Sequence, residues 1–513
     1  MKKILIAIFA IVSLSAQAQQ NTLLEQSFWQ KSPNVDAVKA EIAKGANATQ
    51  SNASGFDPIV LAINASAPTE TIKYMLSQPG TDINKLTHDG RNYIHWASSR
   101  GNAEVVEYLL SKKAKVDVED THGSTPFLFG LNGGQQNIKV FDLFLAHGLD
   151  IKKEVNADGA NALLLAVAND KDFVLSNYFI SKGLDWNSVD AAGNNAFGYA
   201  AKAGNIELLK ALVAKGVKPS PNAMLMAAQG GGGRRGGPAP ASNLAIYEYL
   251  ETLNIKPTVT AKNGENILHA IVRKPNQGEL VQYFLSKGVD VNQADEEGNT
   301  VLMAAAATNR DVAVYEMLLP KVKNINQANN KGVTALALAV GSNSPAIVTY
   351  LISKGADVKA LDKKGNNVAF YLIENYRAPL AQRGPGGPAG APAAQPATDD
   401  LDAKLALLKE KGLDVTAPQK DGNTFYHLAV AKNNLALVKR LQPLNIDVNL
   451  KNKEGFTALH KAALIAKDDV MMQYLLSIGA KKDITTNFKE TAFDLATENE
   501  ALAKNKVSVN FLK

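Results

Sequence analysis

The chain has 513 residues, no cysteine and a formal net charge of +6 at pH 7. The lack of cysteine excludes disulfides, thiol nucleophiles, thiolate metal sites and lipid attachment at a lipobox cysteine. Without Lys2 and Lys3 the formal charge would be +4, which is too small for so long a chain to indicate a nucleic-acid-binding protein.

The first eighteen residues have the pattern of a secretory signal peptide. Lys2 and Lys3 precede an apolar run over residues 4–14, and the small residues Ala16 and Ala18 follow it. The alternative is an N-terminal membrane anchor, but a run of about eleven apolar residues is short for a bilayer that needs roughly 20. We therefore expect cleavage after Ala18, no membrane span afterwards, and, because the Met-Lys-Lys start is of bacterial type, a periplasmic or secreted protein.

A segment of about 33 residues is repeated along most of the chain. Its clearest copy is DGRNYIHWASSRGNAEVVEYLLSKKAKVD at residues 89–117. In each copy a glycine precedes a short apolar segment, and a second apolar run follows about seven residues later, which is typical of a turn-helix-turn-helix unit. The marker glycines are Gly90, Gly123, Gly159, Gly193, Gly264, Gly298, Gly332, Gly365, Gly422 and Gly455.

The two wider gaps between marker glycines each contain an insertion rich in Gly, Pro and Ala. Residues 221–228 and 244–257 supply one further repeat around an insert at 229–242, and a second insert occupies 378–399. Both inserts fall between the two helices of a repeat, so a regular array would carry them on one face, which is often the binding side. The alternative is tolerated surface low complexity.

We predict an all-α solenoid of about 12–13 helix-turn-helix repeats in one continuous array, with its apolar seam between repeats. Residues 19–50 form a degenerate N-terminal repeat or cap, 51–484 the array, and 485–513 a C-terminal capping repeat. Leu302 and Leu459 are expected in the seam.

The repeat resembles the ankyrin repeat. The likeness rests on segments such as STPFLF and FTALHKAA, on the Gly-Asn that starts the second helix at Gly101, and on endings such as KGADV at residues 354–358. This resemblance implies β-turn fingers between the helix pairs and a structural role for the recurring histidines, which brace the finger and the first helix. Those histidines are His95, His269, His427 and His460. They stand one or more repeats apart, so they do not form a metal site.

Two further residue types have structural interpretations. Threonines such as Thr125, Thr300 and Thr334, and asparagines such as Asn161 in other repeats, occupy the N-cap position of the first helix. Trp96 is expected to fill the core between repeats.

No pattern of an enzyme is present in the sequence. We find no nucleophile elbow, Ser/His/Asp set, dinucleotide fingerprint or His-Glu-x-x-His segment, and the glycine-rich stretch at 230–242 lacks the Gly-Lys-Ser/Thr ending of a phosphate loop. We therefore predict no catalytic residue, no cofactor and no bound metal.

The predicted function is binding of a protein partner through the concave face made by finger tips and first helices. The variable binding positions of ankyrin repeats, placed on this sequence by resemblance, select one set of partner-binding residues: His88, Asp89, Arg91, Arg100, Lys262, Arg273, Lys274, Lys331, Lys363, Lys364, Lys420 and Lys432. The lysines of the second half are expected to face solvent and to suit an anionic partner.

Other interpretations stay open at this point. The same residues could be an ordinary solvated rim. The protein could be an accessory in periplasmic peroxide defence beside a catalase or peroxidase, or could bind an extended cell-envelope glycan, although the selected residues include no aromatic. We expect a monomer and no nucleic-acid partner, and the partner's identity is unknown.

Overall fold

The computed structural model describes residues 21–230, 243–377 and 400–513, so the predicted signal peptide and nearly all of both inserts lie outside the described residues. Within these ranges the secondary structure consists of α-helices, short 3-10 helices and isolated β-bridges, with no extended strand. The predicted all-α class is confirmed. The chain divides into two compact units, Met1–Ser220 and Pro221–Lys513, a division that the regular repeat spacing did not predict.

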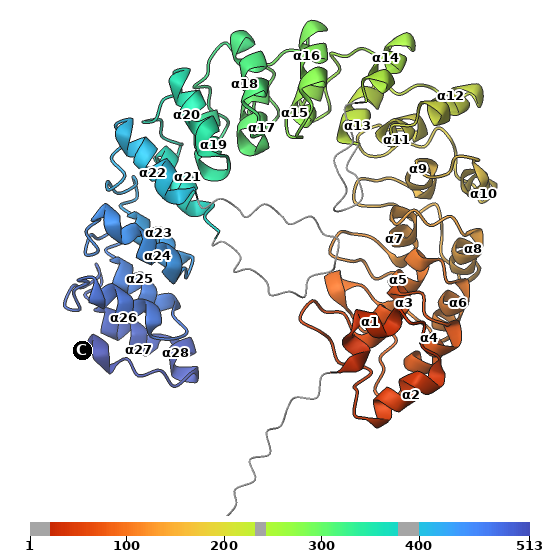
Figure 1. The fold of residues 1–513 in the computed structure, drawn as a ribbon, viewed down its shortest axis with the longest axis horizontal. Helices are drawn as coiled ribbons and strands as arrows, with labels where there is room; N and C mark the ends of the chain where they lie inside the picture. The colour runs from red at the N-terminus through yellow and green to blue at the C-terminus, as the bar shows by residue number, and fades with distance from the viewer. Residues whose placement is uncertain (1–20, 231–242, 378–399) are drawn as a thin grey trace, which may run out of the picture. The chain divides into compact units, whose positions relative to one another are not determined.

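In the first unit, successive helices pair into repeats whose first and second helices form two separate layers (Figure 1). The first helices are α1 (Gln26–Trp29), α3 (Pro58–Asn64), α5 (Tyr93–Arg100), α7 (Pro126–Asn132), α9 (Ala162–Val167) and α11 (Ala196–Lys202). The second helices are α2 (Val35–Ala43), α4 (Thr69–Leu76), α6 (Ala103–Ser111), α8 (Ile138–Ala146), α10 (Val174–Ser181) and α12 (Ile206–Ala214).

The second unit is built in the same way. Its first helices are α13 (Ala223–Gln229), α15 (Ile267–Ile271), α17 (Val301–Thr308), α19 (Ala335–Ser342), α21 (Val368–Glu374), α23 (Phe425–Ala431), α25 (Ala458–Ile465) and α27 (Ala492–Glu498). Its second helices are α14 (Leu244–Thr252), α16 (Gly278–Ser286), α18 (Val312–Leu318), α20 (Pro345–Ser353), α22 (Leu401–Glu410), α24 (Leu435–Leu441), α26 (Val470–Ser477) and α28 (Glu500–Lys504).

The described residues thus contain fourteen helix pairs, slightly more than the sequence suggested. The difference lies at the N-terminal end, where the half-repeat seen in the sequence folds as the short pair α1 and α2. Trp29, at the end of α1, is fully buried, and its indole Nε1 donates to the carbonyl oxygen of Leu23 at 2.8 Å. This indole anchors the first pair.

The first helices begin at the predicted caps. The hydroxyl of Thr300 accepts from the amide of Met303, and the side chain of Asn161 accepts from the amide of Leu164 at 3.1 Å. Each cap satisfies one of the amides that a helix start leaves without a partner. Because these caps recur at one position of the repeat, the first helices that carry them start in the same register.

In six repeats of the described residues, the finger is a tight turn closed by a single β-bridge at the cap residue. Ala294 bridges Thr300, and Ala328 bridges Thr334, in successive repeats. Gly332, at the tip of the second of these fingers, has a φ of +81°, and a Cβ atom added there would lie 2.5 Å from the backbone nitrogen of Lys363 in the next finger. Glycine is therefore required both by the left-handed backbone and by the close approach of the neighbouring finger.

The core is a seam between neighbouring repeats. Leu302 and Leu459 are buried, as expected for the seam, and so are the alanines Ala305 and Ala339 on the neighbouring helices α17 and α19. Small residues let these first helices approach each other closely, and each repeat buries its apolar face only against the next.

Candidate functional site

The four recurring histidines are structural. In His95 the Nδ1 atom accepts the backbone N–H of the cap residue Asn92 at 3.2 Å, and Nε2 donates to the carbonyl oxygen of Ser124 in the next finger at 3.1 Å. His427 repeats this arrangement with Thr424 at 3.1 Å and Phe456 at 2.9 Å. Burial lowers the pKa of His95 and of His427 to about 4, so both rings are neutral near pH 7. The role implied by the resemblance is confirmed.

Two kinds of site are absent from the described part of the chain. It holds no group of three or more His, Asp or Glu side chains placed to bind a metal ion. It also holds no helix of the length and apolarity that a membrane crossing requires.

The fingers of the second unit are joined into a ladder by backbone hydrogen bonds between their tips. The amide of Asn330 donates to the carbonyl of Glu297 at 2.8 Å, and that of Lys363 to Lys331 at 3.0 Å. The next rungs run from Lys420 to Gly365 at 3.3 Å and from Lys453 to Asp421 at 2.9 Å. The finger tips are therefore held in fixed positions relative to their neighbours.

Four of the predicted binding residues lie on consecutive fingers of this ladder. Lys331, Lys363, Lys364 and Lys420, which we call the finger lysines, are all exposed. None of them forms an ion pair with a described acidic residue. Lys262, at an earlier finger tip, is likewise exposed. The structure thus brings together, on one edge of the second unit, four exposed lysines without ion pairs to the described residues, beside exposed acidic residues such as Glu297 and Asp421 on the same ladder.

Three other predicted residues of the second unit are already engaged. Arg273 pairs with Glu265 at 2.7 Å. The ammonium group of Lys274 donates to the carbonyl oxygens of Ala228, at 2.5 Å, and Gly230, at the end of α13. Lys432 donates to the carbonyl oxygen of Glu374 at the end of α21.

Lys274 and Lys432 were predicted to bind a partner, and the structure places their ammonium groups against backbone carbonyl oxygens. Both follow a repeat that carries an insert, and both donate to the last carbonyls of that repeat's first helix. Helix C-termini leave carbonyls without intrahelical partners and attract cations, so the two ammonium groups act as caps.

In the first unit the structure corrects the prediction for Arg91. Its side chain is buried, its Nε donates to Asp120 at 2.8 Å, and its guanidinium lies over the rings of Phe129 and Trp96 at 4.4 and 5.2 Å from their centroids. Trp96 is 8% exposed, in agreement with its predicted place in the core. Arg91 therefore joins repeats instead of facing a partner, and it occupies the ring faces that a sugar would need for stacking.

The remaining predicted residues of the first unit are partly exposed but have partners. His88 stacks on Phe56 and contacts the carbonyl oxygen of Ser54 through Nδ1 at 2.8 Å. Asp89 contacts Arg91 at 3.0 Å. Arg100 is exposed and donates to Asn64 at 3.1 Å. Because these side chains already have polar partners, they are less available to a charged partner than the finger lysines are.

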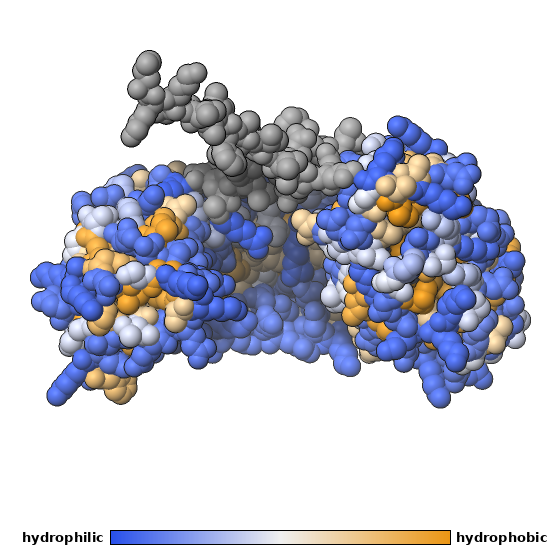
Figure 2. Space-filling view, turned by 90° about the horizontal axis from the view of Figure 1, so that it is seen from below, coloured by the Kyte–Doolittle hydropathy of each residue, from blue (hydrophilic) through white to orange (hydrophobic). Residues whose placement is uncertain are grey.

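The surface gives little support for apolar recognition. The face in Figure 2 is largely hydrophilic, with apolar residues in patches that hydrophilic residues separate. Exposed large apolar side chains such as Leu86, Val189 and Phe488 come from distant parts of the chain. Single exposed apolar residues are normal on protein surfaces, so the finger ladder remains the more distinctive feature.

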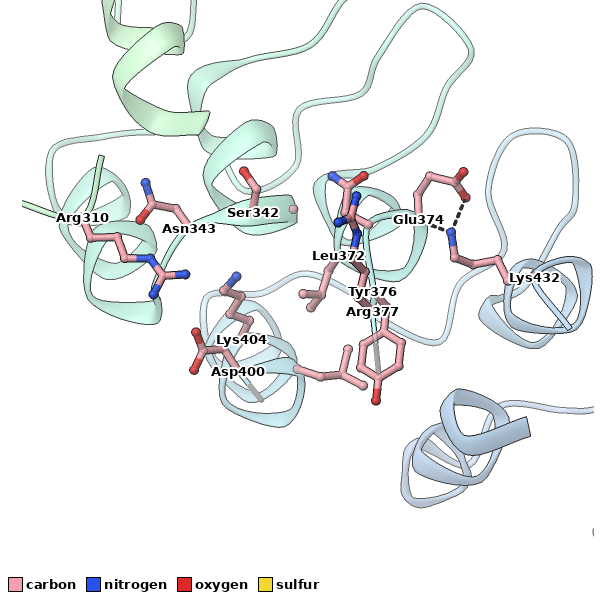
Figure 3. Close-up of a pocket in the computed structure, with 13 residues that line it drawn as sticks. Arg310, Ser342, Asn343, Leu372, Glu374, Tyr376, Arg377, Asp400, Lys404 and Lys432 are labelled. Carbon is pink, nitrogen blue, oxygen red and sulfur yellow. Dashed lines mark hydrogen bonds and ion pairs between the residues drawn. The ribbon is translucent and has the colours of Figure 1, made fainter. Parts of the chain in front are cut away.

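A pocket of about 620 Å³, which was not predicted from the sequence, lies in the second unit between α19, α21 and α22 (Figure 3). Its most unusual lining residue is Lys404 of α22, which is only 4% exposed. The signal was present in the sequence: Lys404 stands in helical spacing with Leu401, Leu405 and Leu408, so a charged residue occupies the apolar stripe of its helix.

Comparison with known proteins agrees with this architecture. A family model for ankyrin repeats, each match containing three copies, matches residues 30–121, 128–224, 243–326, 268–362, 393–486 and 426–510. The chain is 24% identical to the human transient receptor potential cation channel subfamily A member 1, over 86% of this chain and 32% of that protein. It is 26% identical to the chicken nuclear factor NF-kappa-B p105 subunit, over 52% of this chain and 25% of that protein.

A bacterial relative, a putative ankyrin repeat protein of Rickettsia bellii, is 30% identical over 18% of this chain and 51% of its own length. The chain thus spans about a third of the length of the human channel protein and a quarter of that of the chicken protein. With matches to the family model over most of its length, this chain belongs to the ankyrin repeat family.

Proposed function

We propose that this chain is a non-enzymatic scaffold that binds an acidic surface of another protein through the finger lysines of its second unit. Ankyrin repeats generally mediate protein–protein interaction, which supports the general class of function. The observation that carries the specific proposal is the position of Lys331, Lys363, Lys364 and Lys420 on consecutive rungs of the finger ladder, exposed and without acidic partners among the described residues.

The physical argument concerns preorganisation and charge. The rungs between neighbouring finger tips fix the backbone that carries the lysines, so binding would order only their side chains and would cost little backbone entropy. Exposed like charges on one edge accelerate encounter with an oppositely charged surface and make association sensitive to salt.

The polar groups of the interior support a binding role over a catalytic one. The Nε2 atoms of His269 and His460 contact the backbone carbonyls of Asn299 and Ile484 at 3.2 and 3.0 Å, like those of the other two recurring histidines. Their pKa values are lowered by burial. A general base needs access to its substrate. These imidazole rings are buried and their ring nitrogens are used in hydrogen bonds within and between repeats, so they have no such access.

We also propose that the protein acts outside the cytoplasm, in the periplasm or after secretion. The support is the sequence of residues 1–18, with its two lysines, short apolar run and small residues before Gln19. Intact-mass measurement of protein from the envelope fraction tests this. A mature chain that starts at Gln19 is expected, and a chain that retains residues 1–18 would contradict it.

The binding proposal is tested by comparative capture from the envelope fraction. Wild type is compared with a variant in which the four finger lysines are changed to Glu, and with a control in which Lys323, Lys354, Lys409 and Lys481, exposed lysines away from the finger tips, are changed to Glu. A partner retained by wild type and by the control but lost from the finger variant is expected. A partner retained equally by all three would contradict the proposal.

A further inference from the structure

An asparagine that follows the last residue of the first helix has a recurring role in this chain. The side-chain amide of Asn309 donates to the carbonyl oxygen of Val272 at 2.8 Å, and that of Asn343 donates to Ala306 at 3.0 Å. Asn499 does the same to Ala463 at 2.8 Å. In each case the acceptor is the sixth residue after the cap of the preceding repeat's first helix, where a carbonyl has no partner within the helix.

In the repeat of α21 and α22 a lysine takes over this role. Val340 is the sixth residue after the cap Thr334 of α19, and its carbonyl oxygen accepts from the Nζ atom of Lys404 at 3.0 Å. α21 ends at Glu374 with Asn375 as its C-cap, and α22 begins only at Leu401. The carbonyl oxygen of Val340 accepts from Lys404, which reaches it from one turn inside α22.

A lysine is not equivalent to the asparagine that it replaces. The amide of Asn343 reaches a second carbonyl oxygen, that of Asn309, at 2.7 Å, so both of its N–H groups are used. The ammonium of Lys404 has three N–H groups and a full charge, yet it makes a single hydrogen bond to the described residues. No described carboxylate lies within 4.0 Å of it. Burying a cation in this way is costly unless an anion accompanies it.

The surroundings of Lys404 add positive charge. Arg310, in the connection between α17 and α18, lines the same pocket. Burial is the largest cause that lowers the pKa of Lys404; attraction by Asp400 raises this pKa, and repulsion by Arg310 lowers it. Arg310 is exposed and forms no ion pair with the described residues. On the other side of the pocket, Glu374 lies 3.9 Å from the ammonium of Lys432. Figure 3 shows Arg310 and Lys404 extending into the same space, with Glu374 directed toward Lys432.

We propose that this pocket binds a small oxyanion, the carboxylate or phosphate group of a small molecule, between the ammonium of Lys404 and the guanidinium of Arg310. The two unused N–H groups of Lys404 and the planar fork of Arg310 suit such oxygens, and hydrogen bonds to a charged acceptor are stronger than neutral ones. The pocket volume of about 620 Å³ lies within the range of sites for small ligands. This site is separate from the finger lysines and does not depend on their role.

The competing explanation is that Lys404 only caps α19. A cation at a helix C-terminus is favourable without any ligand. The two explanations differ in one measurable respect, because a cap alone creates no saturable binding of an added anion.

The test is titration calorimetry of the full chain with inorganic phosphate and, separately, with citrate, at an ionic strength held constant with sodium chloride. We expect saturable binding of one equivalent of at least one of the two anions. Arg310→Gln and Lys404→Met should each weaken it at least tenfold, whereas Lys409→Met, which changes an exposed lysine on the same helix, should leave it unchanged.

Arg310→Gln keeps the test decisive if Lys404→Met does not fold, since Arg310 is exposed and bonds to no described residue. Failure of both anions to bind wild type, or equal binding by wild type and Arg310→Gln, would overturn the proposal. The variant with four finger lysines changed to Glu should bind the anion like wild type, so failure of the scaffold proposal and failure of this one are distinguishable.

Discussion

The Nε2 atom of His95 lies 3.1 Å from the carbonyl oxygen of Ser124, so a side chain in one repeat supports the finger of the next. The same contact joins His269 to Asn299, His427 to Phe456 and His460 to Ile484, at 2.9 to 3.2 Å. The seam between repeats is therefore polar at its finger edge and apolar between its helices. Both parts couple a repeat to its neighbours, which is how a solenoid gains stability.

We expect these histidines to make the protein sensitive to acid. The pKa of His95 is about 4 when folded and 6.5 in the reference state, so the unfolded chain takes up a proton first as the pH falls. The stability contributed by the neutral ring of His95 is complete above pH 6.5 and is lost toward pH 4, by on the order of 3 kcal/mol. When the pH is lowered from 7 to 4.5, the free energy of unfolding in urea should fall less for His95→Gln than for wild type. An equal loss would show that the ring does not control the acid response.

The finger ladder predicts that two glycines with similar backbones differ in their tolerance of a side chain. Gly332 and Gly355 have φ values of +81° and +94°. A Cβ atom added at Gly332 would contact the backbone of Lys363, whereas a Cβ atom added at Gly355 would have no atom within 4 Å. Gly355→Ala should cost about 1 kcal/mol through backbone strain, and Gly332→Ala roughly 1–3 kcal/mol more. Urea midpoints of the two variants measure this difference. Equal midpoints would mean that the fingers are not held in contact.

The seam itself can be tested at Leu302, which is 2% exposed between repeats. Leu302→Ala should lower the free energy of unfolding by roughly 2–5 kcal/mol, because it removes buried methyl groups and leaves a cavity. Val189→Ala is the control, since Val189 is 56% exposed and its truncation should change stability by about 0.5 kcal/mol or less. Chemical denaturation measures the free energy of unfolding of both variants. Similar decreases for the two variants would show that Leu302 does not lie in a packed seam.

A further prediction concerns alkaline pH. Burial lowers the pKa of Lys404 from 10.5 to about 8. Attraction by Asp400 opposes this shift, and repulsion by Arg310 adds to it. Between these values the unfolded chain holds the proton and the folded chain releases it, so wild type gains stability as the pH rises. In a chloride buffer, the free energy of unfolding of wild type relative to Lys404→Met should rise by about 2 kcal/mol from pH 7.5 to pH 9.5. The free energy of unfolding of wild type relative to Lys409→Met should not change with pH in this range. If the difference between wild type and Lys404→Met is also independent of pH, the lowered pKa of Lys404 is contradicted.

The repeat, its caps and the role of the histidines could be predicted from the sequence because they depend on local spacing. The cap at Thr300 acts within three residues of its own position, and the ring of His269 contacts the cap of its own helix and the next finger at a place that recurs in four repeats. The side chains of Arg91, Lys274 and Lys432 were assigned to the binding face by their position in the repeat, yet each is long enough to reach a group in a neighbouring repeat. Position in the repeat gives the face of a residue but not what the end of a long side chain contacts. For Lys404, the spacing with Leu401 and Leu405 showed a charge in an apolar stripe, while its acceptor, 64 residues away, required the fold.

The most direct test of the scaffold account is the association rate of the captured partner at two salt concentrations. Wild type, the variant with Lys331, Lys363, Lys364 and Lys420 changed to Glu, and the variant with Lys323, Lys354, Lys409 and Lys481 changed to Glu are compared after circular dichroism shows that all three are folded. We expect the finger variant alone to associate at least tenfold more slowly at low salt, with a difference that shrinks at high salt as the charges are screened. Association of the finger variant at the wild-type rate, at both salt concentrations, would contradict the account.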